Sequence, residues 1–164
     1  MMKNTDILES HIREKRKVID YDIKSFTVAL LIQRYIEGLE ENNNKIYIPN
    51  YQSTLVWDKE KQSKFIESVI LDLPIPFIFT ADVPTQRLEV VDGSQRIRTL
   101  AAFMTNQFCL ENLDILNNLT GCYFEDLPLP RQRKFQDSHI RLVIFDHADE
   151  NARLMMFKHI NNLK

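Results

Sequence analysis

Glycine is scarce in this chain, and the scarcity limits the turns and loops that it can build. Only Gly38, Gly93 and Gly121 occur in 164 residues, where average usage of about 7% would give roughly eleven. No two of them stand close enough for a P-loop or for the G-x-G-x-x-G turn of dinucleotide-binding folds. Both common glycine-rich phosphate loops are therefore excluded, and a phosphate site here would need a different construction.

The rest of the composition is that of an ordinary soluble domain. Hydrophobic residues make up 44% and charged residues 27%, and 21 Lys and Arg against 23 Asp and Glu give a net charge of −2. This balance argues against coating DNA by bulk electrostatics, and two cysteines, Cys109 and Cys122, cannot supply a four-thiolate zinc site. No secretory signal is visible, and no apolar run approaches the ~20 residues that cross a bilayer. We therefore expect a cytoplasmic protein with no membrane association.

Hydrophobic spacing indicates where helices and strands fall along the chain. Residues 1–22 are charged throughout and predict a solvated helical segment, whereas residues 23–164 predict one folded domain. Within the domain we expect helices at about residues 27–40, 59–73, 94–104, 129–136 and 148–160. We expect strands over residues 46–48, 77–79, 88–91, 108–110 and 140–145. Asp58 has the character and position of a helix N-cap. The alternation predicts an α+β fold, a small sheet flanked by helices.

The segment Val90-Val91-Asp92-Gly93-Ser94-Gln95-Arg96 is the strongest indication of a site. An apolar strand ends, a glycine permits a tight turn, and a helix begins whose first N–H groups attract anions. Ser94, Gln95 and Arg96 add a hydroxyl, an amide and a guanidinium that suit phosphate oxygens, and Asp92 suits Mg²⁺. In the alternative interpretation Asp92 or Ser94 only caps the helix and Arg96 lies on the surface.

A second candidate segment follows the strand at 46–48. Tyr51 and Trp57 could stack on a base, and Gln52 could bond to its edge. Alternatively, the two aromatic side chains complete the core around the following helix.

The order of these segments resembles the N-terminal domain family of GmrSD-type, modification-dependent restriction enzymes. In that family a Pro-x-aromatic-Gln loop precedes Glu-Ser-[Ile/Val]-Leu and Leu-Pro-Ile-Pro elements and an Asp-Gly-Gln-Gln-Arg motif. The matching stretches here are Ile48 to Gln52, Trp57-Asp58, Phe65 to Phe79, Val90 to Leu100 and Met156 to Asn161. The resemblance covers about residues 23–161.

The resemblance implies a ParB/sulfiredoxin-like fold in which a nucleoside triphosphate binds beside the start of a helix. In the family the Asp-Gly-x-Gln-Arg motif is associated with nucleotide binding and hydrolysis, which control a separate nuclease domain in restriction and phage-defence systems. By position the implied catalytic residues are Asp92, Gln95 and Arg96, with Asp92 also a Mg²⁺ ligand. The implied nucleotide-binding residues are Tyr51, Gln52, Gly93, Ser94 and Asn161.

The chain departs from the family pattern at two positions. Ser94 replaces a usual Gln, and its hydroxyl can still donate to phosphate. Ser53 replaces the Arg that usually follows Gln52, which removes a charge-assisted bond and should weaken binding or turnover. The C-terminal His-Asn-His nuclease domain of the larger enzymes is expected to be absent, so we do not expect DNA cleavage by this chain alone.

The sequence therefore favours two functions of different kinds. The first is a nucleotide-binding regulatory domain that acts with a separate nuclease or effector and reaches DNA through that partner; the resemblance adds Mg²⁺-dependent NTP hydrolysis to this expectation. The second is a non-catalytic module that binds DNA or protein.

Overall fold

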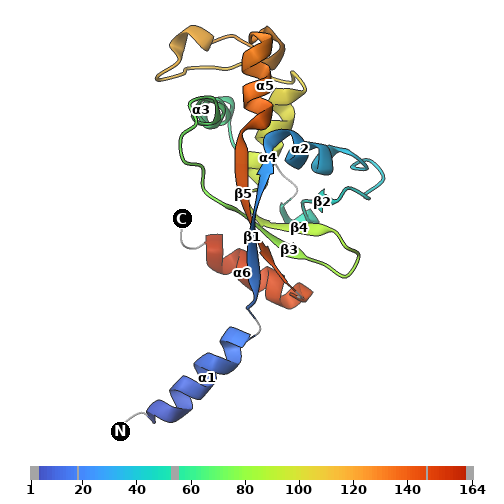
Figure 1. Cartoon of the computed structure of the whole chain (residues 1–164), viewed down its shortest axis with the longest axis vertical. Coiled ribbons are helices and arrows are strands. Elements are labelled where there is room, and N and C mark those ends of the chain that lie inside the picture. The colour runs from blue at the N-terminus through green and yellow to red at the C-terminus, as the bar shows by residue number, and fades with distance from the viewer. Residues whose placement is uncertain (1–3, 18, 53–55, 147, 162–164) are drawn as a thin grey trace.

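A five-stranded mixed sheet forms the centre of the fold in the computed structural model, which describes residues 4–17, 19–52, 56–146 and 148–161. The strand order is β1-β5-β3-β4-β2 (Figure 1). The β1/β5 and β3/β4 pairs are antiparallel, and the β3/β5 and β2/β4 pairs are parallel. The strands are β1 (Tyr21–Thr27), β2 (Ile46–Tyr47), β3 (Ile78–Asp82), β4 (Leu88–Asp92) and β5 (His139–Phe145).

Helices accompany the sheet on both faces, which confirms the α+β class. The helices of the described residues are α1 (Thr5–Lys17), α2 (Val28–Ile36), α3 (Lys59–Ile70), α4 (Ser94–Met104), α5 (Leu129–Asp137) and α6 (Glu150–Asn161). Short 3₁₀ turns cover Asn50–Gln52, Asn117–Leu119 and Phe124–Asp126. As expected, Asp58 caps α3, since its Oδ1 accepts a hydrogen bond from the Lys61 backbone N–H at 2.8 Å.

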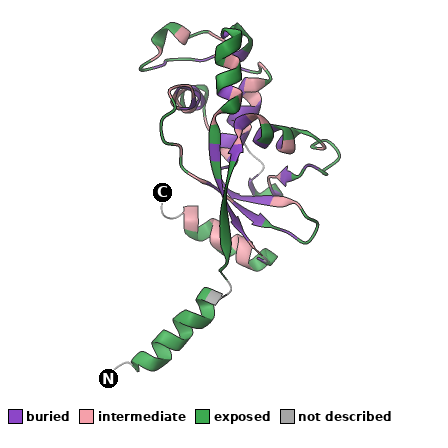
Figure 2. Cartoon of the chain, viewed as in Figure 1, coloured by how far each residue is buried: buried purple, intermediate pink, exposed green. Residues whose placement is uncertain are grey.

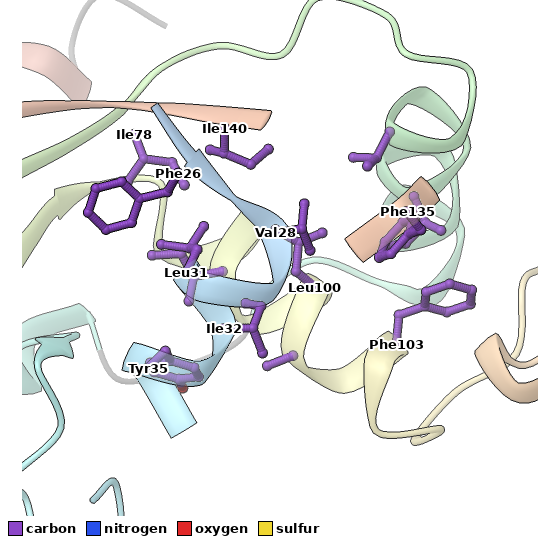
Figure 3. Close-up of a cluster of buried hydrophobic side chains, with 14 of the residues drawn as sticks. Phe26, Val28, Leu31, Ile32, Tyr35, Ile78, Leu100, Phe103, Phe135 and Ile140 are labelled. Carbon is purple, nitrogen blue, oxygen red and sulfur yellow. The ribbon is translucent and has the colours of Figure 1, made fainter. Parts of the chain in front are cut away.

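The core consists of two apolar clusters, one on each face of the sheet. The larger one joins α2 and α4 to β3 and β5, with Leu31 of α2 and Leu100 of α4 fully buried (Figure 3). The smaller one lies under α6 and includes Val91 and Val143. Neighbouring residues of β4 point to opposite faces, so Val90 joins the larger cluster and Val91 the smaller one. Strand β4 is thus buried on both sides, and its last residue, Asp92, is buried as well.

The strands of the sheet differ from the expectation at two places. Strand β1 was not expected, because five of its seven residues are exposed and leave no buried pattern in the sequence (Figure 2). It belongs to the sheet because its backbone pairs with β5 along its whole length. The strand expected over 108–110 is wrong. Leu110 exchanges backbone hydrogen bonds with Gly121 and Cys122 in the following loop, at 2.7 and 2.9 Å, instead of joining the sheet.

The helix expected over 27–40 ends earlier than its apolar spacing suggested. α2 stops at Ile36, and Gly38 has a left-handed φ of 85°. Helix α1 lies within the charged segment 1–22, and it projects away from the sheet with all of its described side chains exposed (Figures 1 and 2). Within the described ranges, no helix combines the length and the apolar character needed to cross a membrane.

Candidate functional site

A pocket of about 450 Å³ opens where β4 runs into α4. Its walls come from the turn at 50–52, the start of α3, the β4–α4 junction and the last turns of α6. All eight site residues predicted from the sequence line it, although they come from three separate segments. The full lining is Tyr51, Gln52, Val56, Trp57, Lys61, Asp92, Gly93, Ser94, Gln95, Arg96, Phe157 and Asn161.

The N-terminus of α4 faces this pocket without a side-chain cap from any described residue. Gly93 is the N-cap, with a left-handed φ of 109°, and Ser94 is buried directly after it. The interpretation that Asp92 or Ser94 merely caps the helix and Arg96 lies on the surface is therefore wrong. Because the first turn of a helix carries N–H groups and a partial positive charge, this end of the pocket favours an anion.

Replacing Gly93 with alanine should destabilise the domain by about 2 kcal/mol. A left-handed conformation costs an L-residue roughly 1–2 kcal/mol, and the new Cβ would lie 2.9 Å from Ile78 Cγ1, closer than real Cβ contacts. Gly121 is a matched control, since it has a φ of 90° with nothing within 4 Å of an added Cβ. Urea unfolding of Gly93→Ala and Gly121→Ala should show the larger loss for Gly93; equal losses would mean that the Ile78 contact relaxes freely.

Arg96 lies beneath the helix start and is only 5% exposed. Its guanidinium donates hydrogen bonds to the Pro76 and Phe77 carbonyl oxygens, and its Nη2 lies 3.4 Å from Asp92 Oδ2. Burial lowers the pKa of Arg96 from its ordinary value, and the Asp92 carboxylate opposes that shift. These contacts tie the β4–α4 junction to the segment that enters β3, so the described geometry makes Arg96 a positioning residue at the base of the pocket.

The donor set does not fit a resident Mg²⁺ ion. Asp92 is buried and ion-paired with Arg96, and no group of three His, Cys, Asp or Glu side chains suited to a metal occurs among the described residues. Mg²⁺ is usually held by one or two carboxylates together with substrate phosphates and water. The described lining of the pocket therefore offers one carboxylate, that of Asp92, which is already paired with Arg96.

Two glutamine side chains hold the pocket walls together. Gln95 Oε1 accepts hydrogen bonds from the backbone N–H groups of Val56 and Trp57, at 2.9 and 3.2 Å. Gln52 Nε2 donates to the carbonyl oxygens of Val90 and Val91, at 2.8 and 3.3 Å. Both amides join a loop to the β4–α4 junction, so their side chains shape the pocket as well as line it.

Aromatic side chains form two sides of the pocket. Tyr51 is 45% exposed and contacts Phe157 of α6 edge to face, with 5.2 Å between the ring centres. Trp57 packs edge to face on Phe65, with 5.8 Å between the ring centres. Burial, followed by the nearby Glu89 carboxylate, raises the pKa of Tyr51. The interpretation that Tyr51 and Trp57 complete the core is wrong in its simple form, because neither belongs to either core cluster.

Lys61 and Phe157 are pocket residues that the sequence analysis missed. Lys61 Nζ lies 5.0 Å from the centre of the Trp57 ring, so the first turn of α3 contacts the residue just before its N-cap, Asp58. A spacing of four residues links Phe157 to Asn161, whose Nδ2 donates to the Phe157 carbonyl oxygen at 2.7 Å. Helical spacing from Asn161 could have found Phe157, whereas no such spacing indicates Lys61, because Trp57 lies before the start of α3. The substitution at Ser53 falls in 53–55, outside the described residues.

The fold and the pocket define a class: a small α+β domain with a pocket at a strand-to-helix junction, which combines an anion-favouring end with aromatic walls. The chain matches the family model of the GmrSD restriction endonuclease, N-terminal domain, over residues 35–164. It therefore belongs to that family, which confirms the resemblance found in the sequence.

Comparison with individual proteins gives a more distant likeness. No curated protein matches the chain. Among solved structures it is similar to the C-terminally truncated chromosome-partitioning protein ParB from Caulobacter crescentus, in a crystal structure with CTP-γ-S. The identity is 11% and the TM-score 0.45, with 87% of this chain and 54% of the ParB chain covered. The chain thus spans about half the length of that ParB chain.

Proposed function

We propose that this chain is a nucleotide-binding module of a GmrSD-type restriction system and that its pocket takes a nucleoside triphosphate. The observation that carries the proposal is the convergence of the eight predicted residues on one pocket. Membership of the family supports it as well. The pocket volume of about 450 Å³ falls within the roughly 300–1,000 Å³ typical of small-molecule sites.

Phosphates and base would occupy different parts of this pocket. The N-terminus of α4, the Ser94 hydroxyl and the Lys61 ammonium provide donors and positive charge for the phosphates. Tyr51, Trp57 and Phe157 provide the aromatic surface on which a base could stack. A nucleotide bound in this way would leave the described hydrogen bonds and ion pairs of the pocket intact.

Hydrolysis of the nucleotide would require side chains that act directly on the phosphates, which binding does not. Asp92 and Arg96, two of the three implied catalytic residues, are both buried and contact each other. For either to act directly on a phosphate, it would have to leave that contact. The proposal is therefore nucleotide binding, with Mg²⁺ entering together with the phosphates, and phosphate release should be measured in parallel as a separate question.

Thermal unfolding with each nucleoside triphosphate, with and without Mg²⁺, tests the proposal. A ligand at about 100 times its dissociation constant adds about 2.7 kcal/mol of stability, or roughly 5–10 °C for a domain of this size. Lys61→Ala should raise the dissociation constant about tenfold, because it removes a charge-assisted contact to phosphate. Titration of the wild type and the variant by calorimetry would measure that difference.

Lys59→Ala is the matched control for Lys61→Ala. Lys59 is exposed on the same helix and lies 5.1 Å from the Phe108 ring, much as Lys61 lies on Trp57, but it does not line the pocket. Its removal should leave nucleotide affinity unchanged. Equal losses from the two variants, or no thermal shift with any nucleotide, would count against the proposal.

The partner and the alternative function remain open to direct tests. Family membership supports an effector nuclease as the partner that responds to nucleotide binding. The DNA-binding alternative has one favourable feature: Arg131 and Lys134 of α5 line a 380 Å³ pocket with His139. Asp72 and Asp137 line the same pocket and offset this charge. Salt-dependent DNA affinity without nucleotide would favour the alternative.

A further inference from the structure

Strand β1 forms the edge of the sheet, and its outer side has no strand partner among the described residues. It is seven residues long and carries two large apolar side chains that are half exposed, Tyr21 at 55% and Ile23 at 49%. An exposed edge of this length is a template for pairing with another strand. The sequence pattern of β1 indicates what that other strand is.

The backbone N–H and C=O groups of β1 point alternately toward β5 and toward the open edge. Asp146 N–H donates to the Asp20 carbonyl oxygen at 2.9 Å and Val28 N–H donates to the Ser138 carbonyl oxygen at 2.8 Å, so the even-numbered positions face β5. Because N–H and C=O of one residue point the same way in an antiparallel strand, the groups of Tyr21, Ile23 and Ser25 face outward. The Ile23 N–H accordingly bonds only locally here, to Asp22 Oδ1 at 2.9 Å.

We propose that β1 pairs with β1 of a second copy of this chain, antiparallel and centred on Ile23. In that register the two Ile23 residues exchange both backbone hydrogen bonds, and Tyr21 lies opposite Ser25 of the other copy. Asp22 then lies directly opposite Lys24 of the other copy, and the symmetry produces this pair twice. The two sheets join into one, and Asp22 turns from the Ile23 N–H to its new cationic partner.

The charges select this register and this partner. Unlike charges directly opposite on neighbouring strands stabilise the pairing, whereas like charges oppose it. Shifting the register by one residue would place polar and apolar side chains on the wrong faces. In an antiparallel pair of β1 strands, the Asp22 of each copy faces the Lys24 of the other, so the partner that fits β1 is a second copy of the same strand.

Helix α1 is accommodated by the same arrangement. It continues from the start of β1 and leads away from its own domain (Figure 1), with Ile7, Leu8 and Ile12 exposed. A 13-residue helix is marginal in water without packing. Since the start of β1 would lie opposite the end of β1 in the other copy, α1 would run beside the start of α2 there and gain a surface to pack on.

Reversing single charges tests the register. By sedimentation velocity over a wide concentration range, the wild type should associate from 19.4 kDa to twice that mass. Asp22→Lys and Lys24→Asp each create like-charge pairs and should each weaken self-association about tenfold or more. Both side chains are exposed, so folding should be preserved. Arg133→Asp, an exposed charge reversal on α5, is the control and should leave the dimer unchanged.

Restoring the complementarity completes the test. Mixing the Asp22→Lys chain with the Lys24→Asp chain pairs lysines with aspartates and should recover a mixed dimer, and the double variant should recover a homodimer. A wild type that stays monomeric throughout, single variants that dimerise normally, or a mixture that stays monomeric would each overturn the proposal.

Discussion

Arg96→Ala should cost about 3–5 kcal/mol of folding free energy, the range for removing one partner of a buried ion pair. The substitution leaves the Asp92 carboxylate buried beside a cavity and takes the hydrogen-bond donor from two carbonyl oxygens, those of Pro76 and Phe77. Since single domains of this kind are stabilised by about 5–15 kcal/mol, the loss is a large part of the total. Urea denaturation of the purified variant would measure it.

Arg98→Ala is the control for this prediction. Arg98 lies two residues further along α4, is half-buried and donates one hydrogen bond, to the Gln52 carbonyl oxygen at 3.3 Å. Its removal should cost about 1 kcal/mol, the value of an ordinary hydrogen bond. If Arg96→Ala costs no more than Arg98→Ala, the buried network does not hold the β4–α4 junction as described.

The prediction also decides how the nucleotide site should be tested. An Arg96 variant that loses nucleotide binding would do so through the fold as well as through any direct contact. A double-mutant cycle of Arg96→Met and Asp92→Asn, measured by urea unfolding, isolates the free energy that the Arg96–Asp92 contact contributes to folding, and the same cycle measured on nucleotide affinity gives the contribution of that contact to binding. Lys61 remains the position at which binding can change without unfolding.

The second large effect is expected at the contact between α6 and the sheet. Arg153 donates through Nε to Glu89 Oε2 and through Nη1 to the Ala148 carbonyl oxygen at 2.8 Å, and Tyr47 donates to Glu89 Oε1 at 3.2 Å. Arg153→Ala leaves Glu89 buried without its cationic partner and should cost about 3–5 kcal/mol. Hydrogen exchange of α6 should rise with it, because a small cluster of apolar side chains is then its main remaining contact.

Lys158→Ala provides the comparison for Arg153→Ala. Lys158 is exposed on the same helix, so its removal should change stability by less than about 0.5 kcal/mol. Because Phe157 and Asn161 of α6 line the pocket, loosening this helix should also weaken nucleotide binding. Faster exchange in α6 without any change in nucleotide affinity would show that the helix does not form a necessary wall.

The local parts of the site could be predicted from the sequence. The strand-to-helix turn at Gly93 and the Asp58 cap both follow from side-chain chemistry acting over a few residues. The choice of Tyr51, Gln52 and Asn161 as neighbours of Asp92 came from the family pattern, and the pocket brings them together. Their joining requires the whole sheet, which no short-range pattern describes.

Other features depended on partners far away in the chain. Arg96 is buried because the carbonyl oxygens at 76 and 77, about twenty residues earlier, receive its guanidinium. Strand β1 exists because β5, more than a hundred residues later, offers its backbone. Backbone hydrogen bonds between strands form whatever the side chains are. An exposed strand such as β1 therefore has no alternating apolar pattern by which the sequence would predict it.

The sequence by itself determined the family, the α+β class, the positions of most helices and strands, and the residues gathered at the pocket. The helices and strands depend on spacing and capping within a few turns, where a residue's own chemistry decides, whereas the family and the pocket residues follow from the order of motifs along the whole chain. Only the tertiary structure decided that Arg96 and the two glutamines support the pocket walls, that Lys61 and Phe157 belong to it, and that β1 forms an open edge. These outcomes depend on which distant backbone groups meet each side chain, and that is settled when the sheet assembles.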